Sequence, residues 1–206
     1  MVSLRGLTGV GKTLVLRALE ALRPGWTLDL EGIAGHRSSL LGMVGLEPVT
    51  QKAFESGLVA RTGVGFPAGV MIVEGESRKV GDVVVPSRIW DSMVGATNVE
   101  VTASVERRVV VLSDDYLADP SSRSRLREQL IRVSERMDDH PDLAGMLDRD
   151  ETGALVEILL ERYYDPLYRK SETGKQYALT ISAESAGTAA AGVVSWVEAA
   201  LLGGES

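Results

Sequence analysis

Short apolar runs and longer segments with helical spacing alternate along the 206-residue chain. The short runs have the length and composition of β-strands. They cover residues 2–5, 26–30, 70–73, 98–103 and 177–181. The segments between them repeat apolar residues every three to four positions, as amphipathic helices do. This alternation predicts an α/β fold of three layers, with a mainly parallel five-stranded sheet between helices.

The helix-spaced segments have recognisable ends. They cover residues 14–22, 52–59, 89–94, 105–116 and 185–202. Pro86 and Ser104 are suited to begin the third and fourth of these helices, and Gly95 to end the third. Within 105–116 the β-branched run Val109-Val110-Val111 leaves a strand as the alternative.

Residues 119–170 interrupt the alternation because they contain no strand-like run. Leu126, Leu130 and Val133 recur on one side of a long helix that is rich in arginine. We predict a helical insertion that acts as a lid within a single domain of residues 1–206. Its arginines fit either a solvated face, because acidic residues are interspersed, or contacts with phosphates and RNA; we favour the solvated face for most of them.

Composition narrows the class of protein. Hydrophobic residues make up 44% and charged residues 25%, as in a globular protein, and the net charge of -7 argues against a surface that is basic throughout. We expect a cytoplasmic protein with no membrane partner, because neither a membrane-spanning run nor a signal-peptide pattern is present. The absence of cysteine excludes disulfides, thiolate metal sites and thiol nucleophiles from this chain. Nothing in the sequence indicates an oligomeric state.

The segment from Gly6 to Thr13 is a complete phosphate-binding loop, G-x-x-x-x-G-K-T, between a predicted strand and a predicted helix. In such a loop, backbone N–H groups surround phosphate oxygens, the lysine adds positive charge, and the threonine hydroxyl binds Mg²⁺. The residues predicted to bind the phosphate-bearing ligand are Gly6, Thr8, Gly9, Gly11, Lys12 and Thr13. This order of strand, loop and helix predicts a fold like that of P-loop NTPases and kinases.

The apolar run 70–73 ends at an acid, Glu74. An acid that follows a buried strand is the usual partner of a phosphate loop, where it helps to hold Mg²⁺. We therefore predict a metal site made by Thr13 and Glu74. Glu76 follows closely and either faces the same site or pairs with Arg78 on the surface.

Polar side chains also lie at the end of the predicted strand 26–30 and directly after it. Strand alternation would place Asp29 and Glu31 on one face, at the carboxyl edge where ligands meet a parallel sheet. His36 and Arg37 add donors suited to phosphate. The alternative is a solvated loop in which Asp29 caps a turn.

Beyond the phosphate loop, four blocks of sequence resemble the C-terminal P-loop domain of tRNA 2-selenouridine synthase. They are DLEGIAGHRSSLLG at 29–42, QKAFE at 51–55, VEGESRKVG at 73–81 and YYDPLY at 163–168. The resemblance implies a transferase that acts on the wobble 2-thiouridine of tRNA. It implies geranylation of the sulfur from geranyl diphosphate, followed by replacement of the sulfur with selenium from selenophosphate. It also implies that either donor occupies the loop with Mg²⁺, and that the reaction centre is lined by Asp29, His36, Arg37, Glu76 and Arg78.

Two features depart from that family. Its members commonly carry H-R-G-S followed by Phe-Gly, whereas this chain has His36-Arg37-Ser38-Ser39 followed by Leu41-Gly42. The family enzyme also carries an N-terminal rhodanese-like domain with an essential cysteine, and this chain has no cysteine. We therefore expect a separate rhodanese-like partner, a piece of a longer enzyme, or a relative with another task.

Two other functions fit a phosphate loop. The first is a stand-alone Mg·ATP-dependent small-molecule kinase or NTPase, with the helical insertion as its lid. The second is a non-catalytic switch that binds ATP or GTP. Binding of tRNA distinguishes the transferase from both.

Overall fold

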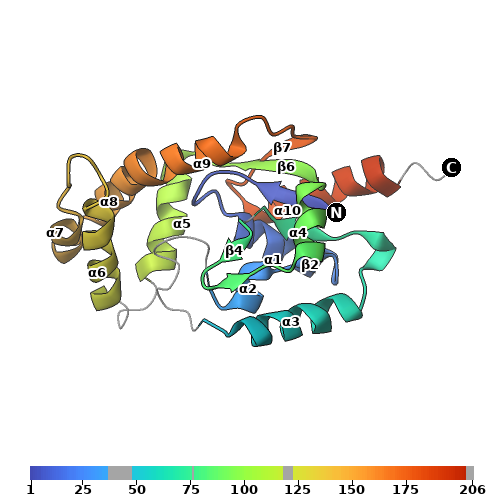
Figure 1. Cartoon of the computed structure of the whole chain (residues 1–206). Helices are drawn as coiled ribbons and strands as arrows, with labels where there is room; N and C mark the ends of the chain where they lie inside the picture. The colour runs from blue at the N-terminus through green and yellow to red at the C-terminus, as the bar shows by residue number, and fades with distance from the viewer. Residues whose placement is uncertain (37–47, 76, 118–122, 203–206) are drawn as a thin grey trace.

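The structure, a computed structural model, describes residues 1–36, 48–75, 77–117 and 123–202 (Figure 1). In this part of the chain the main sheet has five strands in the order β2-β3-β1-β6-β7, and every neighbouring pair is parallel. The strands are β1 (Val2–Arg5), β2 (Thr27–Leu28), β3 (Ile72–Glu74), β6 (Thr97–Thr102) and β7 (Leu179–Ser182). A separate antiparallel hairpin consists of β4 (Lys79–Val80) and β5 (Val83–Val84). The predicted α/β fold with a parallel five-stranded sheet is confirmed.

The register of the central strands brings their carboxyl ends together. Leu4 of β1 lies opposite Glu74 of β3 on one side, and Arg5 lies opposite Glu100 of β6 on the other. The backbone N–H of Gly75 donates to the Leu4 carbonyl at 2.7 Å, so the chain that leaves β3 still borders the end of β1. This edge is therefore the place where the phosphate loop and Glu74 meet.

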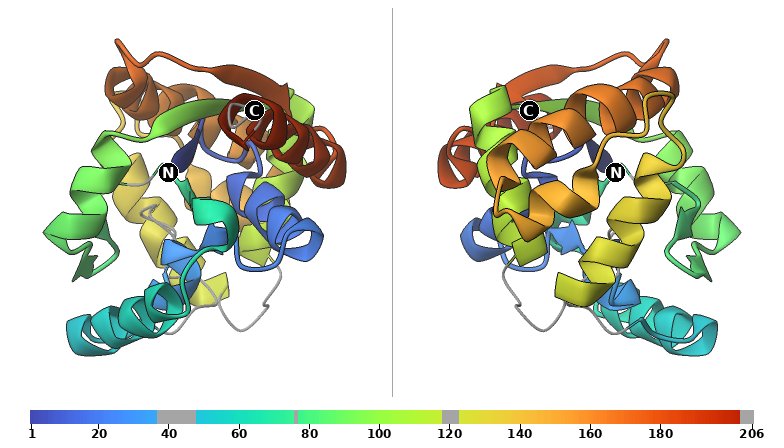
Figure 2. Two further views of the ribbon diagram at one scale, coloured as in Figure 1. Left: turned by 90° about the vertical axis from the view of Figure 1, so that its right-hand side faces the viewer. Right: turned by 90° about the vertical axis from the view of Figure 1, so that its left-hand side faces the viewer.

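Helices cover both faces of the sheet. On one face α1 (Lys12–Leu22) and α10 (Ala186–Val197) lie side by side, as the two views in Figure 2 show, and α10 continues into η4 (Glu198–Leu202). They bury a core with the inward side chains of β1, β3 and β6. On the other face, α2 (Leu30–Ala34), α3 (Gln51–Gly63) and α4 (Ser87–Val94) pack with the hairpin around Phe54 and Leu58. The short 3₁₀ helix η1 (Pro67–Gly69) leads into β3.

The remaining helices form a second region, at the left of the molecule in Figure 1. They are α5 (Val105–Leu117), α6 (Arg123–Ser134), α7 (Leu143–Asp148), α8 (Thr152–Ile158), the π-helical segment η3 (Leu159–Tyr164) and α9 (Asp165–Glu172). They share a hydrophobic core of their own, in which Leu130, Leu143 and Leu159 are fully buried. Helices joined by short turns thus make up most of residues 123–172, and no strand lies among them. That they form an insertion that acts as a lid remains a prediction.

The segment that could have been a strand, residues 105–116, is helical. Val111 and Leu112 are buried, whereas Val105 and Val110 are exposed. This segregation of apolar positions to one side makes a helix favourable in spite of the β-branched run. Ser104 supports its start, because its Oγ accepts a hydrogen bond from the Arg107 N–H at 3.2 Å.

The predicted second strand is shorter than expected. It ends at Leu28, because the carboxylate of Asp29 accepts a hydrogen bond from the N–H of Gly32 and thereby caps α2. Asp29 and Glu31 consequently do not alternate on one strand, and that expectation is wrong.

The predicted helix after Pro86 is confirmed, with Gly95 at its end. None of the helices among the described residues is long and apolar enough to cross a membrane.

Candidate phosphate-binding site

The loop between β1 and α1 depends on glycine at defined positions. Gly6, Gly9 and Gly11 have φ angles of 146°, 78° and 87°, in the region that favours glycine. A Cβ atom on Gly6 would lie 2.2 Å from the carbonyl oxygen of Val101 in β6. The loop therefore passes so close to the sheet that only glycine fits, and α1 begins directly after it at Lys12.

Lys12 and Thr13 lie at the first turn of α1. The Lys12 Nζ donates to the carbonyl oxygens of Gly6 at 3.0 Å and Leu7 at 3.3 Å, and it lies 5.8 Å from the ring centroid of Tyr168 in α9. The Thr13 Oγ1 donates to the Glu74 Oε2 at 3.3 Å. The structure thus brings together the lysine, the threonine and the strand-end acid that the sequence predicted.

These groups fit an Mg²⁺ ion held jointly with a phosphate. A threonine hydroxyl and a carboxylate are hard oxygen ligands, and Mg²⁺ usually takes one or two such ligands while phosphate oxygens and water complete its octahedron. Glu74 is only 2% exposed. The described residues contain no cluster of three or more potential metal-ligating His, Asp or Glu side chains. A metal ion bound by Thr13 and Glu74 remains a prediction.

Thr8 adds a second polar group inside the loop. Its side chain is 8% exposed, and its hydroxyl has no hydrogen-bond partner within the described part of the chain. A buried hydroxyl without a partner costs free energy, which a bound phosphate oxygen would recover.

Arg108 is a residue that the sequence analysis did not assign to the site. It is 4% exposed, its Nε donates to the Thr8 carbonyl at 2.8 Å, and its two terminal nitrogens bind the carboxylate of Asp165 at 3.0 and 2.5 Å. A Cβ on Gly9 would also lie 3.0 Å from the Leu112 side chain. Helix α5 therefore supports the phosphate loop from outside, and Asp165 at the start of α9 holds Arg108 in place.

A sequence signal for Arg108 was present. Arg108 lies three positions before Val111 and four positions before Leu112, so it shares the buried side of the helix with these apolar residues. An arginine on a buried side needs an acidic partner. The block YYDPLY contains such an acid, Asp165, among apolar and aromatic residues.

The residues predicted to line the reaction centre have local structural contacts. The Asp29 carboxylate accepts the Gly32 N–H at 2.7 Å, and a Cβ on Gly32 would lie 2.5 Å from that carboxylate. The Arg78 guanidinium donates to the Ser87 Oγ at 2.9 Å, at the start of α4. Arg37 and Glu76 lie outside the described residues. Catalytic roles for these residues remain predictions.

His36 connects two of the sequence blocks. It is 6% exposed, and its backbone N–H donates to the Glu31 carbonyl at 3.1 Å. Gly81 has a φ angle of 57°, and a Cβ there would lie 2.4 Å from the imidazole ring of His36. The histidine of the first block therefore packs directly against the glycine that ends the second. Only glycine allows this approach.

Together, the parallel sheet, the glycine loop, Lys12 and the Thr13–Glu74 pair define a P-loop protein of the α/β class. The model of the tRNA 2-selenouridine synthase AAA domain matches residues 1–140. The chain belongs to this family.

Curated relatives agree with this assignment. The tRNA 2-selenouridine synthase of Cupriavidus pinatubonensis is 31% identical over 201 residues, which cover 82% of this chain and 53% of the relative. That of Pseudomonas savastanoi pv. phaseolicola is 31% identical over 198 residues, with the same coverage. That of Cupriavidus necator is 32% identical over 195 residues, which cover 80% of this chain and 52% of the relative. The chain thus spans about half the length of these relatives.

Proposed function

We propose that this chain is the phosphate-binding part of a transferase that modifies the wobble 2-thiouridine of tRNA. It binds a phosphate-bearing donor, geranyl diphosphate or selenophosphate, in the loop from Gly6 to Thr13 and presents it to the tRNA. The observation that carries this proposal is the convergence of Lys12, Thr13 and Glu74 at one end of the sheet, in a chain of the 2-selenouridine synthase family.

Lys12 is arranged to exchange partners when the donor binds. Its ammonium group donates to the carbonyls of Gly6 and Leu7, which are neutral acceptors at the mouth of the loop. A phosphate oxygen is a stronger acceptor because it is charged. This exchange of hydrogen-bond acceptors requires little structural change, because the Lys12 side chain stays within the same loop.

The transfer step requires stabilisation of the leaving group. When the thiocarbonyl sulfur of tRNA forms a bond with the first carbon of a geranyl group, the carbon–oxygen bond of the donor breaks and diphosphate leaves with its electron pair. Lys12 and the N–H groups of the loop would stabilise that negative charge. Bound Mg²⁺ would supply a further positive charge beside Thr13 and Glu74.

A thiol-dependent step must be performed by another polypeptide segment, because this chain contains no cysteine. A rhodanese-like partner, separate or covalently joined, fits that requirement. Asp29, His36, Arg37, Glu76 and Arg78 are the candidates for positioning the tRNA base and its sulfur.

Isothermal titration of the 206-residue chain tests donor binding. We expect geranyl diphosphate or selenophosphate to bind with Mg²⁺, and Lys12→Ala to weaken that binding by about tenfold to a hundredfold, because a charged hydrogen bond is lost. Lys52→Ala, on an exposed position of α3, is the matched control and should bind as the wild type does. The proposal would be contradicted if the chain bound Mg·ATP but neither donor. It would also be contradicted if Lys12→Ala and Lys52→Ala bound the donor with equal affinity.

Binding of tRNA is the second test. Fluorescence anisotropy with a tRNA that carries 2-thiouridine should show an affinity that falls steeply as salt rises, since phosphate contacts release counterions. The measurement is made with and without a rhodanese-like partner. Failure to bind tRNA in both cases would rule out the transferase function and favour a kinase or a switch.

A further inference from the structure

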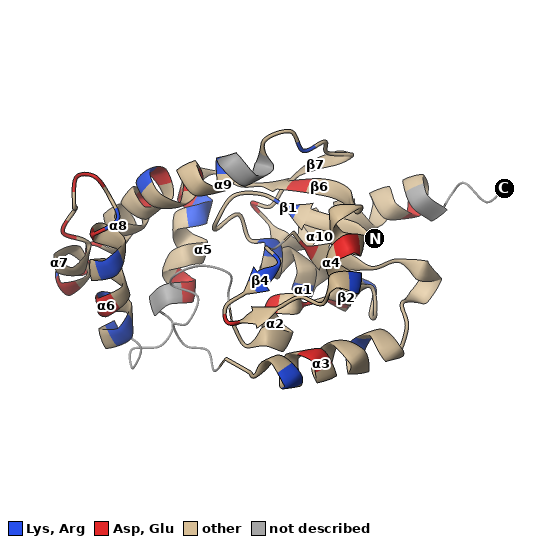
Figure 3. Ribbon diagram, viewed as in Figure 1, with Lys and Arg blue, Asp and Glu red and all other residues tan. Residues whose placement is uncertain are grey.

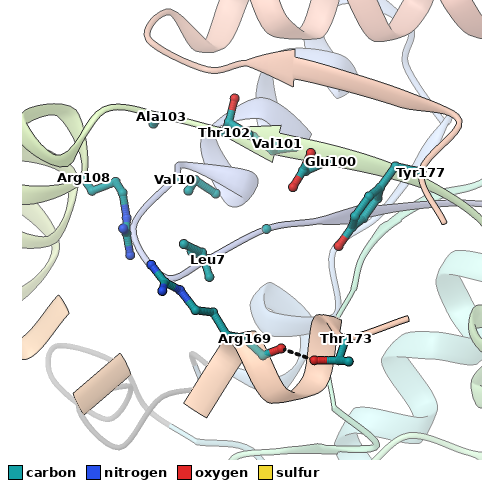
Figure 4. A pocket seen from close by; sticks show the side chains of 11 residues that line it. Leu7, Val10, Glu100, Val101, Thr102, Ala103, Arg108, Arg169, Thr173 and Tyr177 are labelled. Atoms are coloured by element: carbon teal, nitrogen blue, oxygen red, sulfur yellow. Dashed lines mark hydrogen bonds between the residues drawn. The ribbon is translucent and has the colours of Figure 1, made fainter. Parts of the chain in front are cut away.

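One backbone carbonyl of the phosphate loop is held from outside the loop. The Arg108 Nε donates to the Thr8 carbonyl oxygen at 2.8 Å, and both residues are buried. Figure 4 shows the Arg108 side chain extending from α5 toward the loop that carries Leu7 and Val10. Arg108 and Thr8 are 100 positions apart in the sequence. The contact is therefore made by the fold and not by the loop itself.

The position of this carbonyl fixes the direction of the next N–H group. The Thr8 carbonyl and the Gly9 N–H belong to one peptide group, and the described residues contain no cis peptide bond. In a planar trans group the C=O and N–H bonds point in opposite directions. Because Arg108 holds the carbonyl toward α5, the Gly9 N–H points away from α5.

Glycine makes this peptide group easy to rotate in the absence of a partner. Gly9 has a φ angle of 78°, and glycine adopts φ angles of either sign at little cost. A rotated group would present the Thr8 carbonyl to a phosphate, and its partial negative charge would repel the ligand. A guanidinium is a charged donor, so its hydrogen bond to the carbonyl is stronger than one from a neutral group. Arg108 thus favours the orientation in which the N–H is available to an anion.

Asp165 makes Arg108 an orienting group more than a source of charge. Both terminal nitrogens of Arg108 donate to the Asp165 carboxylate, at 3.0 and 2.5 Å. The acid balances the positive charge, and a bidentate pair fixes the plane of the guanidinium. The direction in which the Nε donates is then fixed as well.

The same face of α9 contacts the loop at a second place. Tyr168 lies three positions after Asp165, and residues at this spacing share one face of a helix. The Tyr168 ring centroid lies 5.8 Å from the Lys12 Nζ. Helix α9 therefore borders both the lysine of the loop and the arginine that holds its backbone.

From these observations we propose that Arg108 is a positioning residue for phosphate binding, which orients the Gly9 N–H toward the bound phosphate while Asp165 holds Arg108 in place. The phosphate affinity of the loop then depends on the docking of α9 against α5. The inference rests on the proposed function, because it concerns a phosphate bound in the loop. It is independent of which donor carries that phosphate.

A double variant separates this role from a contribution to stability alone. Arg108→Met/Asp165→Leu removes the donor to Thr8 and leaves no buried charge unpaired. The dissociation constant of the 206-residue chain for inorganic pyrophosphate is measured with Mg²⁺ by isothermal titration. We expect binding to weaken by about tenfold, because the phosphate loses a well-oriented hydrogen bond.

Leu143→Ala is the matched control for a loss of stability. Leu143 is fully buried in the core of the helical insertion, so the substitution lowers the melting temperature. Pyrophosphate should nevertheless bind as tightly as it does to the wild type. A tenfold loss of affinity in this control as well would show that affinity follows general stability, and the inference would be wrong.

Nuclear magnetic resonance observes the Gly9 N–H directly. In the isotope-labelled wild type, we expect pyrophosphate to shift the Gly9 amide proton resonance downfield, because that proton enters a hydrogen bond to an anion. In the double variant at saturating pyrophosphate, most of this shift should be lost. The Thr13 amide, at the first turn of α1, should shift in both proteins and serves as the internal reference.

Arg108→Lys provides a second variant if the double variant does not fold by circular dichroism. Lysine keeps the charge opposite Asp165, but its single nitrogen cannot reproduce the three hydrogen bonds that Arg108 makes to Asp165 and Thr8. We expect pyrophosphate to bind severalfold more weakly. Undiminished affinity in Arg108→Lys would show that Arg108 acts through its charge and would overturn the inference.

The remaining outcomes separate the inference from the proposed function. If the double variant binds pyrophosphate as tightly as the wild type, or keeps the full shift of the Gly9 amide, the buried pair serves stability alone and the inference fails, whereas the proposed function stands. If the wild type binds neither pyrophosphate, geranyl diphosphate nor selenophosphate, the proposed function is contradicted and the inference with it.

Discussion

The phosphate loop is supported on its two sides by different interactions. On the sheet side, glycine backbone passes against β6, and the neutral hydroxyl of Thr13 meets Glu74 at the end of β3. On the side of the helical insertion, one buried charge pair, Arg108 with Asp165, connects α5 and α9 to the Thr8 carbonyl. The sheet side therefore depends on backbone shape, and the insertion side depends on a pair of charges that are far apart in the sequence.

The arginines of the insertion show that burial decides how much an arginine–acid pair contributes to stability. Arg123, Arg127, Arg149 and Arg162 pair with acids on the surface, and Figure 3 shows both signs of charge interspersed over α6 to α8. Arg108 makes the same kind of pair, but with its side chain 5% exposed. Water screens the surface pairs, so each contributes little to stability. The buried pair is not screened in this way, and removal of either partner leaves an uncompensated buried charge.

The largest effect should come from breaking the buried pair. Asp165→Ala leaves the Arg108 guanidinium buried without its acid, and we expect it to lower the free energy of unfolding by about 3–5 kcal/mol. Urea denaturation followed by circular dichroism measures the change. In the double variant Arg108→Met/Asp165→Leu no charge is left buried, so most of the loss should be recovered. A loss below about 1 kcal/mol for Asp165→Ala would contradict the assigned role of the pair.

A backbone change on the sheet side should have the next largest effect. Gly6→Ala places a Cβ 2.2 Å from the Val101 carbonyl at a φ angle of 146°. The conformational strain alone costs about 1–3 kcal/mol, and the loop must also move away from β6. We expect lower stability in thermal denaturation and a weaker affinity for pyrophosphate.

Gly153→Ala is the matched control for Gly6→Ala. A Cβ at Gly153 meets nothing within 4 Å, and the residue lies within helix α8. This variant should gain about 0.5–1 kcal/mol of stability from helix propensity and bind pyrophosphate as the wild type does. Equal behaviour of the two variants would show that the loop tolerates a side chain at Gly6.

These two sides also differ in how far the sequence could predict them. The strand–loop–helix order, the positions of Lys12 and Thr13 at the start of α1, and the acid at Glu74 all follow from short-range patterns, because the chain fixes their relation within a few residues or at a strand end. The end of β2 was missed since Asp29 can either continue a strand or cap a helix, and the backbone N–H of Gly32 decides between them.

The link between Arg108 and Asp165 was missed for another reason. The two residues are 57 positions apart, and only the packing of α5 against α8 and α9 brings them together. No local pattern specifies which acid an arginine meets. The contact of His36 with Gly81 is of the same kind, because it joins two blocks that each form a separate local structure.

A third prediction concerns pH and the attachment of α1 to the sheet. Burial raises the pKa of the Glu20 carboxyl, but hydrogen bonds from Thr27 and Gly25, together with the charge of Arg61, lower it below its ordinary value of 4.5 overall. Because the folded-state pKa is lowered, this carboxylate stabilises the protein above its ordinary pKa. That contribution is lost as the pH falls through the lowered value.

Glu20→Gln tests this pH dependence. We expect the variant to be less stable than the wild type near pH 7 by at most about 1 kcal/mol, because water screens a partly exposed carboxylate. The difference should shrink at an acidic pH below the lowered folded-state pKa, where the wild-type carboxyl is also neutral. Urea denaturation at both pH values provides the comparison. A difference that stays constant with pH would show that the side chain acts through packing instead of charge.

The smallest effect should come from a surface pair of the insertion. The side chains of Arg127 and Asp148 are 47% and 48% exposed, and the Arg127 Nε lies 3.0 Å from the Asp148 carboxylate. A double-mutant cycle with Arg127→Ala and Asp148→Ala should give a coupling energy below about 1 kcal/mol that decreases with salt. A coupling above about 2 kcal/mol would mean that the two surface charges depend on each other as strongly as Arg108 and Asp165 do.

The same Arg127→Ala variant also tests whether the exposed arginines contact RNA. If the affinity for tRNA falls severalfold while stability is unchanged, Arg127 binds a phosphate of the RNA. If affinity and stability both stay constant, Arg127 belongs to a solvated face.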